Sequence, residues 1–307
     1  MSGCRFRVTL LGTGVPIPSP ERFGPCTLVE AGDRKFLIDA GRGAAIRLYQ
    51  LKIPLGRIDL QLLTHFHSDH TSGLPDLWLT GWLSSSFGAR TAPYRVVGPP
   101  GTRTLVENLE RAYAADIKIR IADEKLPPAG VRTEVTEFDR DGVVYQEGGV
   151  KAIAFEVDHG DVIKPCYGYR FEYGGRVVVL SADTRYNENV IRHGAGADLL
   201  IHEVASARPE LMKQAYIRRI IAHHTTPREA GRVFEQTKPK LAAYTHIVLL
   251  GDDTVPPPTV DDIVAETRQT YGGPLEVGED LMTFDVGEAV KVRRFQSLPS
   301  AGRVTAA

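Results

Sequence analysis

Cysteine is scarce in this sequence. Only Cys4, Cys26 and Cys166 occur among 307 residues, and no two of them have a CxxC spacing. An odd number at such wide intervals argues against a disulfide framework and against a thiolate zinc site. We therefore expect reduced, buried thiols.

Long apolar runs are missing as well. No stretch approaches the ~20 consecutive apolar residues that a membrane span needs. The first residues, MSGCRFR, also contain no apolar core of a signal peptide. We therefore expect a cytoplasmic protein that does not contact a membrane.

Neither sign of charge is in excess, since 37 Lys and Arg residues face 38 Asp and Glu residues, for a formal net charge of −1. Such a balance gives no general attraction for a polyanion, so we expect a small-molecule substrate rather than nucleic acid. A local basic patch is still compatible with this net charge. The length and a hydrophobic share of 42% are typical of a globular protein with a large core. The sequence leaves open whether the protein forms a homodimer.

Metal-binding side chains are concentrated in one place. His65, His67, Asp69 and His70 follow directly on the largely apolar residues 60–63. Imidazole nitrogen and carboxylate oxygen are the ligands that suit zinc and its first-row neighbours. In an extended segment His65 and His67 share one face, and a helix that opens just after them turns Asp69 and His70 toward a second ion. The segment therefore predicts two adjacent metals at the end of a strand.

This HxHxDH segment resembles the signature of the metallo-β-lactamase superfamily. LGTGVPIP near the N-terminus, FLIDAGRG, GLP at 73–75 and Ala182-Asp183-Thr184 narrow the resemblance to its tRNase Z and arylsulfatase-like branch. The resemblance implies an α/β (α+β) fold, a four-layer αββα sandwich with the metals at one edge between two sheets. We expect a single domain over 1–295 and a frayed C-terminal tail over 296–307.

The same resemblance supplies the complete ligand set, because His159, Asp183 and His246 each follow an apolar strand in the family's order. It implies one ion on His65, His67 and His159, a second on Asp69, His70 and His246, and a bridging Asp183. Zinc is favoured by ligand type, with manganese or iron as alternatives. Asp39 is expected to support a ligand histidine, although a simple turn carboxylate is an equally good interpretation.

Proton transfer is expected from residues that follow later strands. The tRNase Z resemblance implies that Glu203 and a histidine before a Thr-Pro helix start protonate the leaving group, while Asp69 orients the attacking hydroxide. Alignment to an HTxPxxAG form selects His224, and alignment to an HSTxxxA form selects His223. We predict His224, with a structural role for both histidines as the alternative.

Departures from the family bear on the substrate. In tRNase Z a long tRNA-gripping arm commonly separates the ligand histidine from the bridging aspartate, but only 23 residues separate His159 from Asp183 here. The family's Arg-Tyr after the last ligand histidine is also missing beyond His246. We therefore predict a dinuclear hydrolase whose metal-bridging hydroxide attacks a small ester, a phosphodiester or aryl sulfate. A tRNA 3′-processing endoribonuclease is the second hypothesis, and a non-catalytic metal-binding module is the third.

Four local expectations can be checked against the structure. Trp78 and Trp82, four residues apart, are expected on one helix face, packing in the core or lining the substrate pocket. Residues 102–115 are expected to form one amphipathic helix. The strands at 197–201 and 241–245 are expected to end just before the histidines that follow them.

Overall fold

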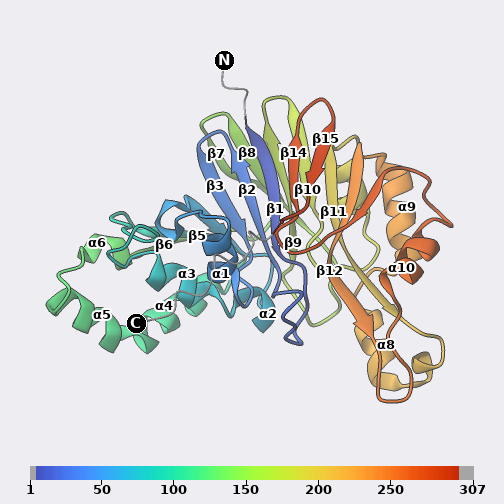
Figure 1. The fold of residues 1–307 in the computed structure, drawn as a ribbon, viewed down its shortest axis with the longest axis horizontal. Helices are drawn as coiled ribbons and strands as arrows, with labels where there is room; N and C mark the ends of the chain where they lie inside the picture. The colour runs from blue at the N-terminus through green and yellow to red at the C-terminus, as the bar shows by residue number, and fades with distance from the viewer. Residues whose placement is uncertain (1–4, 297–307) are drawn as a thin grey trace, which may run out of the picture.

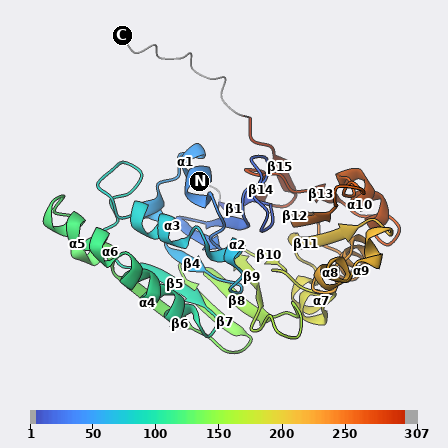
Figure 2. The same ribbon diagram turned by 90° about the horizontal axis from the view of Figure 1, so that it is seen from below.

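The computed structural model describes residues 5–296, which form two β-sheets packed face to face with helices on both outer surfaces (Figures 1 and 2). The predicted four-layer αββα sandwich is confirmed. No helix in this part of the chain has the length and apolar character to span a membrane. The predicted tail, apart from Gln296, lies outside the described residues.

The first sheet is built mainly from the N-terminal half of the chain, in the order β15-β14-β1-β2-β3-β4-β5-β6. Its strands are β1 (Phe6–Gly12), β2 (Cys26–Ala31), β3 (Arg34–Ile38), β4 (Leu60–Leu62), β5 (Tyr94–Gly98), β6 (Thr133–Glu137), β14 (Thr283–Val286) and β15 (Val290–Arg293). The four strands from β3 to β6 are parallel, so their C-terminal ends lie at one edge.

The second sheet has the order β13-β12-β11-β10-β9-β8-β7. Its strands are β7 (Gly142–Glu147), β8 (Val150–Glu156), β9 (Tyr167–Tyr173), β10 (Arg176–Leu180), β11 (Leu199–Ala207), β12 (Leu241–Leu250) and β13 (Leu275–Val277). β10 to β13 are parallel, and β8 shares their direction because β9 is antiparallel to both β8 and β10. The ends of β8, β10 and β12 therefore face the same edge of the molecule.

Helices cover both sheets. On the side of the first sheet lie α1 (Ala44–Gln50), α2 (Ser68–Thr71), α3 (Leu74–Thr80), α4 (Thr102–Ala112), α5 (Ala114–Ala122) and α6 (Pro128–Val131); on the side of the second lie α7 (Glu188–Gly194), α8 (Ala215–Ile221), α9 (Pro227–Thr237) and α10 (Val260–Thr267). The single helix predicted for 102–115 is wrong: two helices meet at Tyr113, and the second continues to Ala122.

Three apolar clusters join these layers, one between the sheets and one under each helical surface. Trp78 and Trp82 belong to the cluster on the first sheet, and their indole N–H groups donate to the carbonyl oxygens of Val131 (2.8 Å) and Pro127 (2.9 Å). Both indoles are therefore core residues with satisfied polar atoms, which excludes the alternative of an aromatic pocket wall.

β11 and β12 run further than the sequence predicts. β11 passes through Glu203 to Ala207, β12 passes through His246 to Leu250, and they stay paired in parallel with a register shift between Glu203 and Val204. His246 has a φ of 43° at this irregularity. A bulge re-aims a side chain without ending the ladder, so polar residues at these positions did not mark the strand ends.

Candidate metal centre

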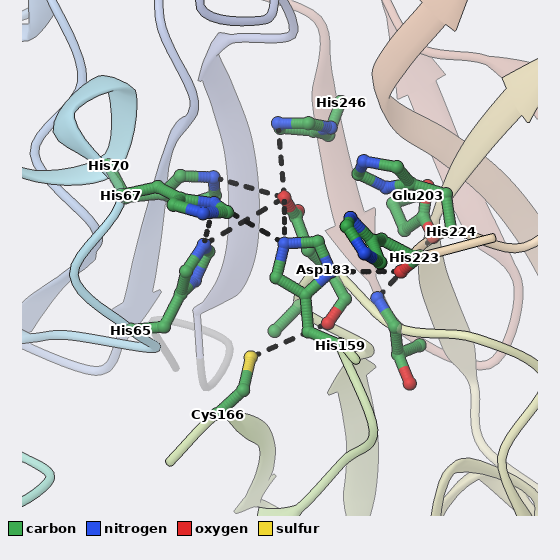
Figure 3. Close-up of polar contacts among 12 residues, drawn as sticks. His65, His67, His70, His159, Cys166, Asp183, Glu203, His223, His224 and His246 are labelled. Carbon is green, nitrogen blue, oxygen red and sulfur yellow. Dashed lines mark hydrogen bonds and ion pairs between the residues drawn. The ribbon is translucent and has the colours of Figure 1, made fainter. Parts of the chain in front are cut away.

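Loops and strand segments from both sheets converge at the edge where the parallel strands end (Figure 3). His65 and His67 follow β4, and α2 opens directly after them, as the sequence predicts. His159 follows β8 and Asp183 follows β10, whereas His246 projects from within β12.

The predicted ligands form two neighbouring groups in which the donor atoms lie within 4.8 Å of one another. The first group is His65, His67, His159 and Asp183, and the second is Asp69, His70 and His246. A third combination, Asp183, His224 and His246, meets the same distance limit. The structure thus brings together all seven residues that the sequence nominates as ligands, and adds His224 at their border.

In the first group three ring nitrogens point at a common space. His67 Nδ1 lies 3.0 Å from His65 Nε2 and 3.3 Å from His159 Nε2. The opposite nitrogens are fixed by neighbours, because His159 Nδ1 donates to the carbonyl oxygen of His223 (2.9 Å) and His65 Nδ1 lies 2.9 Å from Thr64 Oγ1. These contacts orient the lone pairs of His65 and His159 inward.

The second group centres on carboxylates. His246 Nε2 lies 3.3 Å from both Asp69 Oδ2 and Asp183 Oδ2. His70 Nε2 lies 3.3 Å from Asp183 Oδ2 and is a buried nitrogen without a hydrogen-bond partner among the described residues. A carboxylate oxygen therefore stands between the two histidine rings.

This arrangement fits divalent metal ions. Unprotonated imidazole nitrogens directed at one another repel, and an orphaned buried nitrogen such as His70 Nε2 is costly, unless a cation lies between them. Nitrogen and oxygen donors at such spacing are the ligand set of zinc and related first-row ions.

Charge interactions follow the same geometry. Burial disfavours the cationic form of His70, but the charges of Asp183 and Asp39 outweigh it and raise the pKa of His70 well above its ordinary value. Burial raises and the surrounding histidines lower the pKa of Asp183, with a net shift well below its ordinary value. The pocket therefore stabilises a buried carboxylate together with positive charge at the position of His70.

Asp39 supports this pocket from the end of β3. Its Oδ2 lies 2.7 Å from His70 Nδ1, and its Oδ1 accepts from the backbone N–H of Thr64 at 2.9 Å. Asp39 has a φ of 60°, a conformation held in place by these buried contacts. The predicted contact with a ligand histidine is present, and it is more than a turn carboxylate because it also joins the ends of β3 and β4.

The structure pairs Glu203 with His224 rather than with His223. His224 Nδ1 lies 3.2 Å from Glu203 Oε2, and its ring centroid is 5.7 Å from that of His246. Burial opposes the charge of His224, but Glu203 outweighs it and raises the pKa of His224 to about 9. His223 is turned toward Gly160, and within residues 5–296 its ring has no hydrogen bond or ion pair with a carboxylate, although the charges of Asp161 and Arg185 act on it.

Other contributors to the site carry no motif of their own. Thr64 connects Asp39 to His65, and the carbonyl group of His223 fixes His159. Cys166 donates its S–H to the carbonyl oxygen of Asp183 at 3.4 Å (Figure 3). The adjacency of Thr64 to HxHxDH is a usable sequence signal, whereas a backbone carbonyl is invisible until the fold places it.

Fold and site together define a metal-dependent hydrolase with a metallo-β-lactamase fold. Residues 34–247 match the family described as a Beta-lactamase superfamily domain. A Ribonuclease Z of Mycolicibacterium gilvum (strain PYR-GCK) is 37% identical over 289 residues, covering 93% of this chain and 98% of that relative. The chain therefore belongs to the metallo-β-lactamase superfamily, in its ribonuclease Z branch.

Solved structures agree on the fold. Human tRNase Z, short form, has a TM-score of 0.69 at 22% identity and covers 92% of this chain and 99% of its own. The metallo-beta-lactamase fold protein YhfI from Bacillus subtilis has a TM-score of 0.68, also at 22% identity, over 91% of this chain and 98% of its own. At that identity the likeness establishes shared architecture and nothing finer.

Proposed function

We propose that this protein is a tRNase Z-type endoribonuclease that hydrolyses a phosphodiester bond at the 3′ side of precursor tRNA. The observation that carries the proposal is the pairing of two adjoining ligand groups with the Glu203–His224 pair at their border. Relatives that carry the name Ribonuclease Z favour this substrate over the small ester predicted from the sequence. They also outweigh the near-neutral net charge, which argued against nucleic acid.

The proposed resident cofactors are two divalent ions, with zinc favoured by the donor set. His65, His67 and His159 would hold one, Asp69, His70 and His246 the other, and Asp183 would bridge them. When bound, the ions polarise the phosphate and make the attacking water acidic.

The chain's own groups supply orientation and protons. Asp69 is buried, with 2% exposure, so bulk water does not solvate its carboxylate. A fixed, unsolvated carboxylate is suited to orienting the attacking water. Glu203 holds Nδ1 of His224 and raises the pKa of that ring to about 9, which favours its protonated form. The leaving ribose oxygen would take the proton from Nε2 of His224.

The absence of a tRNA-gripping arm does not argue against the likeness of this chain to its relatives, because at least one of them has no room for such an arm either. The interval between His159 and Asp183 contains only a short loop and the β9–β10 hairpin. The Mycolicibacterium gilvum relative is covered over 98% of its length, so it has no long additional segment either. Absence of the arm is therefore compatible with a relative named Ribonuclease Z.

A small phosphodiester is the second candidate substrate, and the exposure of His67 supports it. His67 is the exposed member of the first ligand group, whereas its three partners are buried. Without an arm overhead, small diesters can reach this side of the centre. Both substrates use the same phosphoryl chemistry, so turnover of a diester alone does not decide between them.

A direct comparison tests the proposal. Purified protein loaded with zinc or manganese should remove the 3′ trailer from a synthetic precursor tRNA, with a kcat/KM well above that for bis(4-nitrophenyl) phosphate. Asp183→Ala protein serves as the control for contaminating nuclease. Rapid diester turnover with an intact precursor tRNA would reject the RNA substrate and promote the small diester.

A further inference from the structure

A rigid projection stands beside the metal centre, at the lower right of Figure 1. It consists of the ends of β11 and β12 beyond the register shift, the 3-10 turn Leu211–Lys213 and α8, and the loop 251–258 packs against it. We call residues 204–222 and 247–258 the α8 platform. The catalytic account above uses none of its side chains.

Contacts within the α8 platform hold it in place. Arg208 donates to the carbonyl oxygen of Pro256 (3.1 Å) and pairs with Asp262 (3.1 Å). Gln214 donates to Asp252 at 2.7 Å, and Arg218 donates to the carbonyl oxygens of Met212 and Lys213 at 2.8 and 2.7 Å. Buried Leu211 and Ile217 anchor it below. The projection is thus a fixed surface rather than a loose loop.

Cationic side chains are concentrated in the α8 part of this surface, although the chain's net charge is −1. Between residues 208 and 222 lie four cationic side chains, of Arg208, Lys213, Arg218 and Arg219, against the single acid Glu210. Arg208 and Arg218 are engaged within the platform. The side chains of Lys213 and Arg219 have neither an ion pair nor a hydrogen bond within residues 5–296, and both are exposed.

The nearest acids do not cancel this charge fully. Asp252 is occupied by Gln214 and by Thr254, which lower its pKa far below the ordinary value. It therefore remains negative beside the projection, and an exposed Asp253 follows it. These two carboxylates lie on the side of α8 that faces the loop. Because they repel a polyanion there, we expect a polyanion to bind along the exposed face of the helix.

The exposed face of α8 leads to the catalytic pair. Tyr216, Arg219 and Ala222 are all exposed and follow one another at helical spacing, with Tyr216 46% exposed. His223 and His224 come immediately after Ala222. An aromatic ring and unpaired cations in line with a phosphodiester-cleaving site are the elements that bind a single strand through base stacking and phosphate contacts.

We propose that Lys213, Tyr216 and Arg219 on the α8 platform bind the RNA backbone of the precursor and so replace the arm that this chain lacks. This inference rests on the proposed function, because it assigns a binding surface to the same RNA substrate. The cations contact phosphates and the tyrosine stacks on a base, so the surface affects binding of RNA and leaves hydrolysis of a small diester unaffected.

The test is the variant Lys213→Ala/Arg219→Ala, which spares the bracing Arg218. We expect KM for precursor tRNA to rise about tenfold with kcat nearly unchanged, and turnover of bis(4-nitrophenyl) phosphate to stay at the wild-type rate. Loss of two phosphate contacts should also reduce the slope of log KM against log salt by about 1.5. A purely structural role for these residues would not change that slope.

The matched control is Lys118→Ala/Arg132→Ala, which removes two exposed cations, unpaired within the described residues, from α5 and from the residue after α6, at the opposite end of the molecule in both views (Figures 1 and 2). An unchanged salt slope in the platform variant, or an equal loss in the control, overturns this inference while the proposed function stands. Failure of the wild-type protein to cleave precursor tRNA overturns both.

Discussion

The two ligand groups differ in what lies behind them. In the second group the ligands are buried and His70 is backed by the Asp39 carboxylate at 2.7 Å. In the first group His67 is exposed, and His65 and His159 are backed by a hydroxyl and a carbonyl oxygen. One half of the centre is thus enclosed and supported by charge, and the other is open and supported by neutral groups.

This difference has a physical consequence. A carboxylate behind an imidazole raises the basicity of the nitrogen that faces the metal, more than a neutral acceptor does. Burial also protects the enclosed half from exchange with water. We therefore expect the half with Asp69, His70 and His246 to retain its ion more tightly, and the open half to exchange its ion and receive the substrate.

The largest effect should come from Asp183, the residue shared by both halves. Asp183→Ala removes the carboxylate oxygen that lies 3.3 Å from both His70 and His246. It also removes the one carboxylate that pairs with His65 and His159 within residues 5–296. Metal and activity should disappear together, as measured by elemental analysis and by a diester assay on the same sample. Retention of both ions would contradict the bridging role.

The next largest effect should come from His224, which borders both halves. His224→Ala should reduce the rate about 10²–10⁴-fold, as expected for loss of a general acid, and should leave the metal content unchanged. His223→Ala is the control, because the structure pairs Glu203 with His224 and leaves the His223 ring turned toward Gly160. Loss of metal in His224→Ala would instead make His224 a ligand, as its distance to Asp183 and His246 allows.

A smaller effect should separate the two halves directly. Asp39→Asn should weaken binding of the ion held by His70 about 10–100-fold and affect the other ion much less, because Asp39 reaches His65 only through Thr64. Thr64→Val removes the hydroxyl behind His65, so it should perturb the open half more than the enclosed half. Chelator competition followed by metal analysis distinguishes these variants, and equal weakening of both ions by Asp39→Asn would show that the halves are not independent.

The smallest effect concerns pH. Glu203 overcomes burial to raise the pKa of His224 to about 9, which favours the protonated form of this proposed proton donor; that form is lost as pH rises through the pKa. Bound dications would lower the pKa of His224, because positive charge disfavours the protonated ring, and would so shift the alkaline fall in rate to lower pH. The rate should therefore fall about tenfold per unit above a pKa at or below about 9. His224→Ala should lack this alkaline limb, and an identical limb in the variant would assign it to another group.

Much of the open half and part of the enclosed half were predictable because their residues lie in one short segment. HxHxDH places His65, His67, Asp69 and His70 at the end of β4 whatever the rest of the chain does, and α2 opens where the pattern requires. The sequence also predicted that Asp39 supports a ligand histidine. That this histidine is His70 became clear only from the parallel pairing of β3 with β4.

Features that depend on distant packing were harder to predict. The two motif alignments select different histidines, and although we predict His224, it is the position of Glu203 on β11 that favours it over His223. The continuation of β11 and β12 beyond the centre was hidden by their polar residues, which resemble strand ends until a bulge accommodates them. The α8 platform was missed for the same reason, because it is built on those extensions.

The count of metal ions per chain during chelator titration tests the central claim most directly. The account predicts about two divalent ions per chain in the loaded protein, with one released at clearly lower chelator concentration than the other. His67→Ala should hold only the tightly bound ion. Protein that contains no transition metal and regains no activity with zinc or manganese, or that releases both ions in one step, would contradict it.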